Sequence, residues 1–156
     1  SLAEQGNLLS RENRDDSILR RLRLKYLLEK DFVILHPEDT VMSRSMDIVH
    51  TSRNIFPVVD NAGVLTGILY SDRLLELLVS KKEEDQKRWV KDIAQPANKT
   101  IEVDTPMFEV MQIMDRQDTR ILPVTDAKGI YLGFVTKNRI FNKYRIMLMR
   151  QVDYMQ

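Results

Sequence analysis

The sequence contains no cysteine, and this absence removes several chemistries at once. Disulfide bonds, thiolate catalysis and cysteine-ligated zinc are all excluded. Histidine is scarce too: only His36 and His50 occur, and no metal-ligand spacing surrounds them. No stretch approaches the about 20 apolar residues that span a bilayer, and the first residues lack the apolar core of a signal peptide. We therefore expect a soluble fragment without a metal site, in which His36 is a surface residue.

The chain also lacks an excess of charge of either sign. Its 24 basic residues face 23 acidic ones, which gives a formal net charge of +1. A dedicated nucleic-acid binder would show a basic excess, so no nucleic-acid partner is expected. No P-loop, Ser-His-Asp pattern or paired acid/base carboxylates occur, which argues against an enzyme. The missing initiator Met is typical of a piece cut from a longer protein.

What the chain does contain is a repeated phrase. "NIFPVVDNAGVLTGIL" and "RILPVTDAKGIYLGFV" lie 66 positions apart and align without a gap. Seven of the 19 columns that begin at Ile55 and Ile121 are identical. Apolar residues match apolar residues in most of the others. This internal duplication predicts two copies of one structural unit.

Each copy predicts a strand, a turn and a second strand. The first strands are "FPVVD" and "LPVTD", which are short and rich in β-branched residues. In "DNAG" and "DAKG", an Asp starts the turn and a Gly supplies the positive φ that closes it. Gly67 and Gly133 lie inside the returning strands "VLTGILY" and "IYLGFVT". A missing side chain at these two positions indicates a close approach of another backbone.

Helices are expected on both sides of each hairpin. "SDRLLELL" and "KNRIFNKYRIMLM" follow the hairpins with apolar residues at helical spacing. "HPEDTVMSRSMDIVHTS" and "VDTPMFEVMQIMDRQ" precede them, each with a Pro and acidic residues near its start. The short strands "FVIL" and "TIEV" lead into these helices. The fold class is therefore α+β, with two β-α-β-β-α units packed around a pseudo-twofold axis.

The remaining segments are interpreted as connections. The expected boundaries are an N-terminal helical linker at 1–30, repeat one at 31–80, an inter-repeat linker at 81–98, repeat two at 99–150 and a tail at 151–156. Trp89 is expected to anchor the inter-repeat linker on the body. The basic and apolar stretch "RRLRLKYLLEK" fits either a linker helix packed on the body or a contact with a membrane domain or anionic lipid heads.

The repeated phrase resembles a tandem pair of CBS domains, known as a Bateman module, from about Phe32 to Tyr144. Three further phrases resemble the cytoplasmic C-terminal region of bacterial ClC-type chloride channels and transporters: "LAEQGNLLS", "SRNIFPVVD" and "GFVTKNRIFNKYR". The ClC resemblance implies a regulatory domain at the cytoplasmic face of the inner (plasma) membrane, joined to an ion-conducting membrane domain. The CBS resemblance implies a homodimer formed through the CBS helices.

The CBS resemblance also implies two clefts between the repeats that can hold ATP, ADP or AMP as a regulatory ligand, with no cofactor required. A Ser/Thr three residues after the strand Gly, and an Asp three residues further on, are the family's polar signature. Transferred to this sequence, the first cleft comprises Ile34, Leu35, Arg53, Asn54, Ile55, Thr136, Lys137 and Arg139. The second, weaker cleft comprises Ile101, Arg120, Ile121, Tyr70 and Arg73.

This sequence departs from the signature in both clefts. Arg139 and Arg73 stand where the family has the Asp, and Tyr70 replaces the hydroxyl residue, whereas Thr136 matches. Arginine cannot accept a hydrogen bond from ribose, although it can pair with phosphate. Two alternatives stay open: a nucleotide sensor that regulates the membrane domain, or a structural CBS pair that only dimerises and couples subunits. A free-standing or other-transporter CBS energy sensor that binds AMP or ATP is the rival interpretation.

Overall fold

The computed structural model describes residues 17–155, with side chains through Val152. The segment "LAEQGNLLS" therefore lies outside the described residues. Repeat one contains η2 (Met42–Arg44), α2 (Ser45–His50), β1 (Ile55–Val59), β2 (Leu65–Tyr70) and α3 (Ser71–Leu78). Repeat two contains β4 (Ile101–Glu102), α6 (Met107–Arg116), β5 (Ile121–Thr125), β6 (Tyr131–Thr136) and α7 (Lys137–Met155). The connecting elements are η1 (Leu24–Tyr26), α4 (Glu83–Gln86), α5 (Val90–Ile93) and β3 (Gln95–Pro96).

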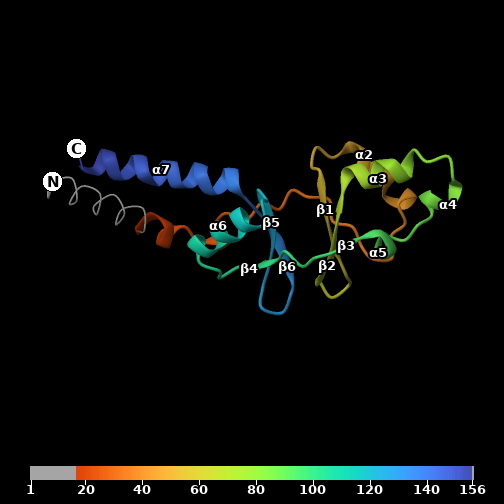
Figure 1. Cartoon of the computed structure of the whole chain (residues 1–156), viewed down its shortest axis with the longest axis horizontal. Coiled ribbons are helices and arrows are strands. Elements are labelled where there is room, and N and C mark those ends of the chain that lie inside the picture. The colour runs from red at the N-terminus through yellow and green to blue at the C-terminus, as the bar shows by residue number, and fades with distance from the viewer. Residues whose placement is uncertain (1–16, 156) are drawn as a thin grey trace.

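The strands form two three-stranded sheets, ordered β1-β2-β3 and β4-β5-β6. The two hairpins stand side by side in the middle of an elongated molecule, with α2 and α3 beyond one hairpin and α6 and α7 beyond the other (Figure 1). The α+β class and the two packed repeats are thus confirmed. Among residues 17–155, no helix combines the length and the apolar character needed to cross a membrane.

The hairpin turns form as the sequence predicts. The Asp60 carboxylate accepts hydrogen bonds from the N–H groups of Ala62 and Val64, both at 2.9 Å. Asp126 does the same in repeat two, at 2.8 and 3.0 Å. Gly63 and Gly129 close the turns with φ of 85° and 83°. An Asp that caps the turn and a Gly that tolerates positive φ together set the hairpin register.

The two turns also join the repeats to each other. Leu65 N–H donates to the Gly129 carbonyl at 3.0 Å, and Tyr131 N–H donates to the Gly63 carbonyl at 2.9 Å. Replacing each residue by its counterpart in the other repeat turns each of these two hydrogen bonds into the other. They place the pseudo-twofold axis between the hairpins, as the duplication predicts.

Gly67 and Gly133 lie where another backbone segment crosses each hairpin. A Cβ on Gly67 would be 2.8 Å from the Gln95 carbonyl oxygen, and one on Gly133 would be 2.8 Å from that of Glu29. Gln95 belongs to β3, while Glu29 forms an isolated antiparallel bridge with Phe134. The predicted close backbone approach is therefore confirmed in both repeats.

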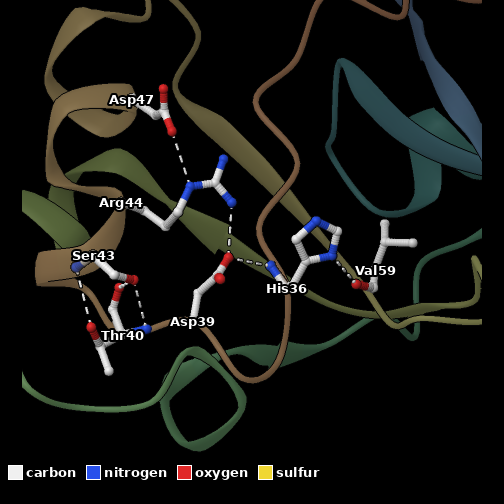
Figure 2. A network of polar contacts seen from close by, with 7 residues as sticks. All are labelled: His36, Asp39, Thr40, Ser43, Arg44, Asp47 and Val59. Atoms are coloured by element: carbon white, nitrogen blue, oxygen red, sulfur yellow. Dashed lines mark hydrogen bonds and ion pairs between the residues drawn. The ribbon is translucent and has the colours of Figure 1, made fainter.

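The segment before α2 differs from the prediction of a strand followed by a long helix. "FVIL" provides one parallel bridge, from Leu35 to Val58, and residues 36–41 form a turn before η2. Polar contacts stabilise this turn (Figure 2): Asp39 accepts from the His36 N–H and pairs with Arg44, both at 2.8 Å. Because Pro37 and its neighbours are held in this turn, the helix starts later than the acidic cluster suggested. His36 is exposed, as predicted, and its ring nitrogen Nδ1 donates to the Val59 carbonyl at 2.8 Å.

The core divides into one cluster per repeat and a third at the seam between them. The seam cluster consists of Phe32, Ile55, Val59, Leu65, Ile68 and Phe134. Met107 and Met114 on α6 are buried in the repeat-two core. The inter-repeat linker is anchored by Val90, which is fully buried, whereas the Trp89 side chain is 44% exposed. The prediction of a tryptophan anchor is wrong, because the Trp89 backbone bridges to Thr40 while its ring stays at the surface.

Tyr131 carries a buried hydroxyl that has no hydrogen-bond partner. Burial raises the pKa of this phenol, and the nearby Asp31 carboxylate adds to the shift. An unsatisfied buried polar group costs about 1–3 kcal/mol. We therefore expect Tyr131→Phe to raise the free energy of unfolding by about 1 kcal/mol in urea denaturation. A clear loss of stability would show that the hydroxyl has a partner in solution.

Candidate functional site

The first predicted cleft is organised around Glu29, a residue outside the predicted set. Its backbone pairs with Phe134: Glu29 N–H donates to the Phe134 carbonyl at 2.7 Å, and Phe134 N–H donates back at 2.9 Å. Its carboxylate accepts a hydrogen bond from the Thr136 hydroxyl at 2.5 Å and pairs with Arg53 Nη2 at 3.2 Å. The Glu29 side chain is only 13% exposed. The structure thus brings Arg53 and Thr136 together, but through a carboxylate of the chain itself.

Two further contacts complete this cluster. Arg53 Nη2 pairs with Asp31 at 2.5 Å, and its guanidinium lies over the Phe32 ring, 4.4 Å from the centroid. Phe32 in turn packs on Phe134 with 4.4 Å between ring centroids. Arg139, which replaces the family's Asp, donates from Nη1 to the Leu28 carbonyl at 3.2 Å. The two arginines of this cleft are therefore both engaged by the segment that precedes repeat one.

Other predicted members of the first cleft lie apart from this cluster. Leu35 is fully buried in the core of repeat one. The Lys137 ammonium pairs with Asp115 on α6 at 3.2 Å. Asn54 uses its carbonyl to accept from Ser71 N–H, where α3 begins. Ile55 belongs to the seam cluster and lines the cavity of the second cleft instead, and Ile34 is partly buried against the seam cluster.

The ion pair between Asp31 and Arg53 changes the pH at which the Asp31 carboxyl titrates. The hydrogen bond from Arg53 lowers the pKa of the Asp31 carboxyl below its ordinary 3.8. A carboxyl whose pKa is lowered by folding stabilises the folded state. This contribution is complete at pH values above the ordinary pKa, and it is lost as the pH falls through the lowered pKa. We expect the carboxyl carbon of Asp31 to titrate below pH 3.8 in NMR. In Arg53→Gln the midpoint should return toward the ordinary value; an unchanged midpoint would contradict the pairing.

The second predicted cleft contains an open cavity of about 120 Å³. Both repeats and the inter-repeat linker line it: Ile55, Ile68, Tyr70, Gln95, Pro96, Ala97, Asn98, Lys99, Thr119, Ile121, Leu122 and Pro123. An adjoining hollow of about 400 Å³ runs along α3 and shares Tyr70 and Gln95 with the cavity. Arg73 lies in this hollow and pairs with Glu76 at 3.4 Å.

Of the residues predicted for the second cleft, Tyr70, Ile121 and Arg73 line these two spaces. Ile101 is buried in the repeat-two core. The Arg120 side chain donates to Asn138 at 3.3 Å. Sequence reasoning missed the linker residues that close each cleft, Glu29 to Phe32 and Gln95 to Lys99. Extending the 66-residue shift upstream would have placed Glu29 on Gln95 and indicated that both occupy equivalent places beside the hairpins.

The basic stretch at Arg20 to Lys30 packs on the body of repeat two. Leu22, Leu24 and Leu27 are buried in its core, which supports the packed-linker interpretation. The segment is not one continuous helix, because η1 and the extended residues around Glu29 follow the first helical turn. A hollow of about 540 Å³ lies between residues 19–25 and 103–108, away from both clefts. In the part of the chain that the structure describes, no cluster of His, Cys, Asp or Glu could hold a metal ion.

Comparisons with known proteins agree with this architecture. The CBS domain family model matches the chain twice, at residues 24–80 and 90–145. A CBS domain-containing protein of Dictyostelium discoideum is 28% identical over 132 residues, which cover 78% of this chain and 90% of that protein. The structure of CBSX2 in complex with AMP superposes with a TM-score of 0.64 at 21% identity, covering 83% of this chain and 98% of that one.

The CBS domain of a bacterial CNNM/CorC family Mg²⁺ transporter, solved in complex with ATP, is similar to the same degree. Its TM-score is 0.67 at 18% identity, with 84% of this chain and 92% of that chain covered. These structural similarities identify the fold. The double match of the family model covers most of the sequence. The chain belongs to the CBS domain family and contains two CBS domains in tandem.

Proposed function

We propose that this chain is a regulatory, non-enzymatic CBS pair that senses an adenine nucleotide in its second cleft and passes the occupancy of that cleft to an ion-transport domain. The observation that carries the proposal is the open cavity between the repeats at Tyr70 and Ile121. Such a seam can couple binding to movement, because a ligand that touches both repeats favours one arrangement of them.

The second cleft has the chemistry that a nucleotide needs. Its isoleucines, Ile55, Ile68 and Ile121, offer an apolar surface to a flat base. At about 120 Å³ the cavity is smaller than the about 300 Å³ at which whole-ligand pockets begin. We infer that only the base lies inside, with the ribose and phosphate in the hollow along α3. Arg73 in that hollow can pair with phosphate, a contact of a different kind from the ribose contact of the missing acid.

The first cleft is the weaker candidate on geometric grounds, although it keeps the family's hydroxyl at Thr136. Its cations and its hydroxyl already have partners in Glu29, Asp31 and Leu28. A ligand there must replace these contacts before it gains any of its own. The nucleotide complexes of CBSX2 and of the CNNM/CorC domain support adenine nucleotides as the ligand class.

Attachment to a transporter is supported by the likeness to the CNNM/CorC transporter domain. Attachment to a ClC-type chloride channel or exchanger rests on the sequence phrases alone, above all "GFVTKNRIFNKYR". The second candidate is a free-standing CBS sensor that regulates another protein. The Dictyostelium relative favours it, because 90% of that protein is covered by this chain. Reading the coding sequence upstream of Ser1 for apolar membrane helices separates the two.

We also propose a homodimer that forms through the CBS helices. Met46 and Val49 on α2 are 67% and 59% exposed, and Phe108 on α6 is 59% exposed. Exposed apolar side chains on helices of both repeats are typical of protein interfaces. We expect Met46→Lys to weaken dimerisation at least about tenfold in sedimentation velocity, without changing thermal stability by more than about 0.5 kcal/mol. An unchanged dimer would place the interface elsewhere.

Isothermal titration with AMP, ADP, ATP and adenosine tests the proposed ligand. We expect binding that depends on phosphate, that is abolished by Ile121→Trp and that is weakened at least tenfold by Arg73→Ala. Arg116→Ala on the surface of α6 removes an equal charge and is the matched control. Binding that survives Ile121→Trp, or equal losses in both arginine variants, would contradict the site. Hydrolysis of any nucleotide by the purified protein would contradict the non-enzymatic role.

A further inference from the structure

The segment 28–32, which we call the linker strand, pairs with β6 through a single bridge at Glu29 and carries charged side chains into the first cleft. Backbone pairing between Glu29 and Phe134 fixes its register, in the same way as Gln95 pairs with Ile68 in the other sheet. Gly133 lets this strand approach, because a Cβ there would be 2.8 Å from the Glu29 carbonyl oxygen. The position of the Glu29 carboxylate is therefore determined by the sheet.

That carboxylate binds the groups that an incoming phosphate would use. It accepts from the Thr136 hydroxyl at 2.5 Å and from Arg53 at 3.2 Å. Thr136 is further held by the Arg139 N–H, which donates to its hydroxyl oxygen at 3.1 Å. A carboxylate and a phosphate oxygen have the same requirements here, namely a guanidinium and a hydroxyl donor. With a 13% exposed side chain, Glu29 fills the polar part of the cleft.

The second cleft lacks this arrangement. A shift of one repeat, in either direction, gives the corresponding residues of the second cleft. Glu29, Asp31, Arg53 and Thr136 correspond to Gln95, Ala97, Thr119 and Tyr70. No carboxylate stands on the linker strand there, and a cavity remains open beside Gln95. The same fold thus presents one cleft that is filled by an internal anion and one that is not.

We propose that Glu29 is a built-in ligand of the first cleft, so that a phosphate-bearing ligand and the linker strand 28–32 compete for Arg53 and Thr136. A phosphate can enter only when the Glu29 carboxylate leaves, and its entry weakens the docking of the strand by the same factor. The strand lies near the start of the first CBS domain, whose match begins at residue 24, so occupancy of this cleft changes the connection between this domain and the residues before it. The inference rests on the proposed function only in assuming that CBS clefts of this chain can accept phosphate-bearing ligands.

Glu29→Gln tests the competition, because it keeps the size and the backbone pairing but removes the negative charge. AMP is the probe, adenosine the uncharged control, and amide NMR shifts report each cleft separately, with Thr136 for the first and Asn98, on the linker that lines the cavity, for the second. We expect AMP to bind the first cleft at least tenfold more tightly in Glu29→Gln than in the wild type, and adenosine to change less than twofold. Glu38→Gln, a surface carboxylate that pairs with Lys91, is the matched control and should change neither.

Hydrogen exchange gives an independent readout of the strand. Saturating AMP should speed exchange of the Glu29 and Phe134 amides of the wild type at least tenfold relative to the ligand-free protein, with a smaller effect in Glu29→Gln, where the competing charge is absent. No gain in AMP affinity at Thr136, or an equal gain for adenosine, would overturn the inference. The Asn98 signals report the proposed nucleotide site in the same spectra, so failure of that site is seen separately from failure of the competition.

Discussion

Replacing Phe134 with alanine is expected to lower the free energy of unfolding by about 3–5 kcal/mol, the usual cost of removing a fully buried phenylalanine. Phe134 is fully buried in the seam cluster, where it packs on Phe32 and lies 5.8 Å from the Tyr131 ring centroid. Its backbone also holds Glu29. The truncation therefore removes contacts between the repeats and from the linker strand at once. Urea denaturation followed by circular dichroism measures the loss.

Phe56→Ala is the matched control for this substitution. Phe56 is equally buried, but it belongs to the core of repeat one. We expect a similar loss of unfolding free energy, with exchange of the Glu29 amide accelerated only in Phe134→Ala. A loss below about 1 kcal/mol in Phe134→Ala would contradict a seam that stabilises the pair.

The second large effect is expected at Gly133. An alanine there combines two costs: φ is +144°, and the new Cβ would be 2.8 Å from the Glu29 carbonyl oxygen. Unfavourable φ costs about 1–3 kcal/mol, and overpacking a further about 1–3 kcal/mol. We expect Gly133→Ala to lower the free energy of unfolding by about 3–5 kcal/mol in urea denaturation.

Alanine substitutions at two other glycines measure the backbone cost and the steric cost separately. Gly63 has φ of +85° but only ordinary 3.6 Å contacts, so Gly63→Ala carries the backbone cost alone. A Cβ on Gly67 would be 2.8 Å from the Gln95 carbonyl oxygen, but Gly67 has no positive φ, so Gly67→Ala carries the steric cost alone. Gly133→Ala should therefore be the most destabilising of the three. If Gly63→Ala cost as much as Gly133→Ala, the close approach of the linker strand would play no part in stability.

The parts of the fold that local chemistry determines were predictable from the sequence. Asp60 and Gly63 define a turn because their side-chain and backbone preferences act within four residues. The span Ser71–Leu78 was predicted as a helix and is one. Before α2 the local signals were misleading: Pro37 and the acidic residues fit a helix start, but the contacts of Asp39 hold them in a turn.

The candidate site was harder to predict because its contacts are distant in sequence. Glu29 reaches Arg53 across 24 positions and Thr136 across 107. The segment "LLEKD" has neither the alternation of a strand nor the spacing of a helix, because one residue of it pairs as a bridge. Arg53, Thr136 and Arg139 were named from the family signature, but that signature could not show that the chain's own carboxylate meets them.

A structure of the wild-type protein with AMP tests the central claim most directly, namely that the open second cleft is the nucleotide site. We predict a base between Ile55 and Ile121, a phosphate beside Arg73, and the Glu29 carboxylate still bound to Thr136. A nucleotide found in the first cleft with Glu29 displaced, while the cavity at Tyr70 stays empty, would contradict the account.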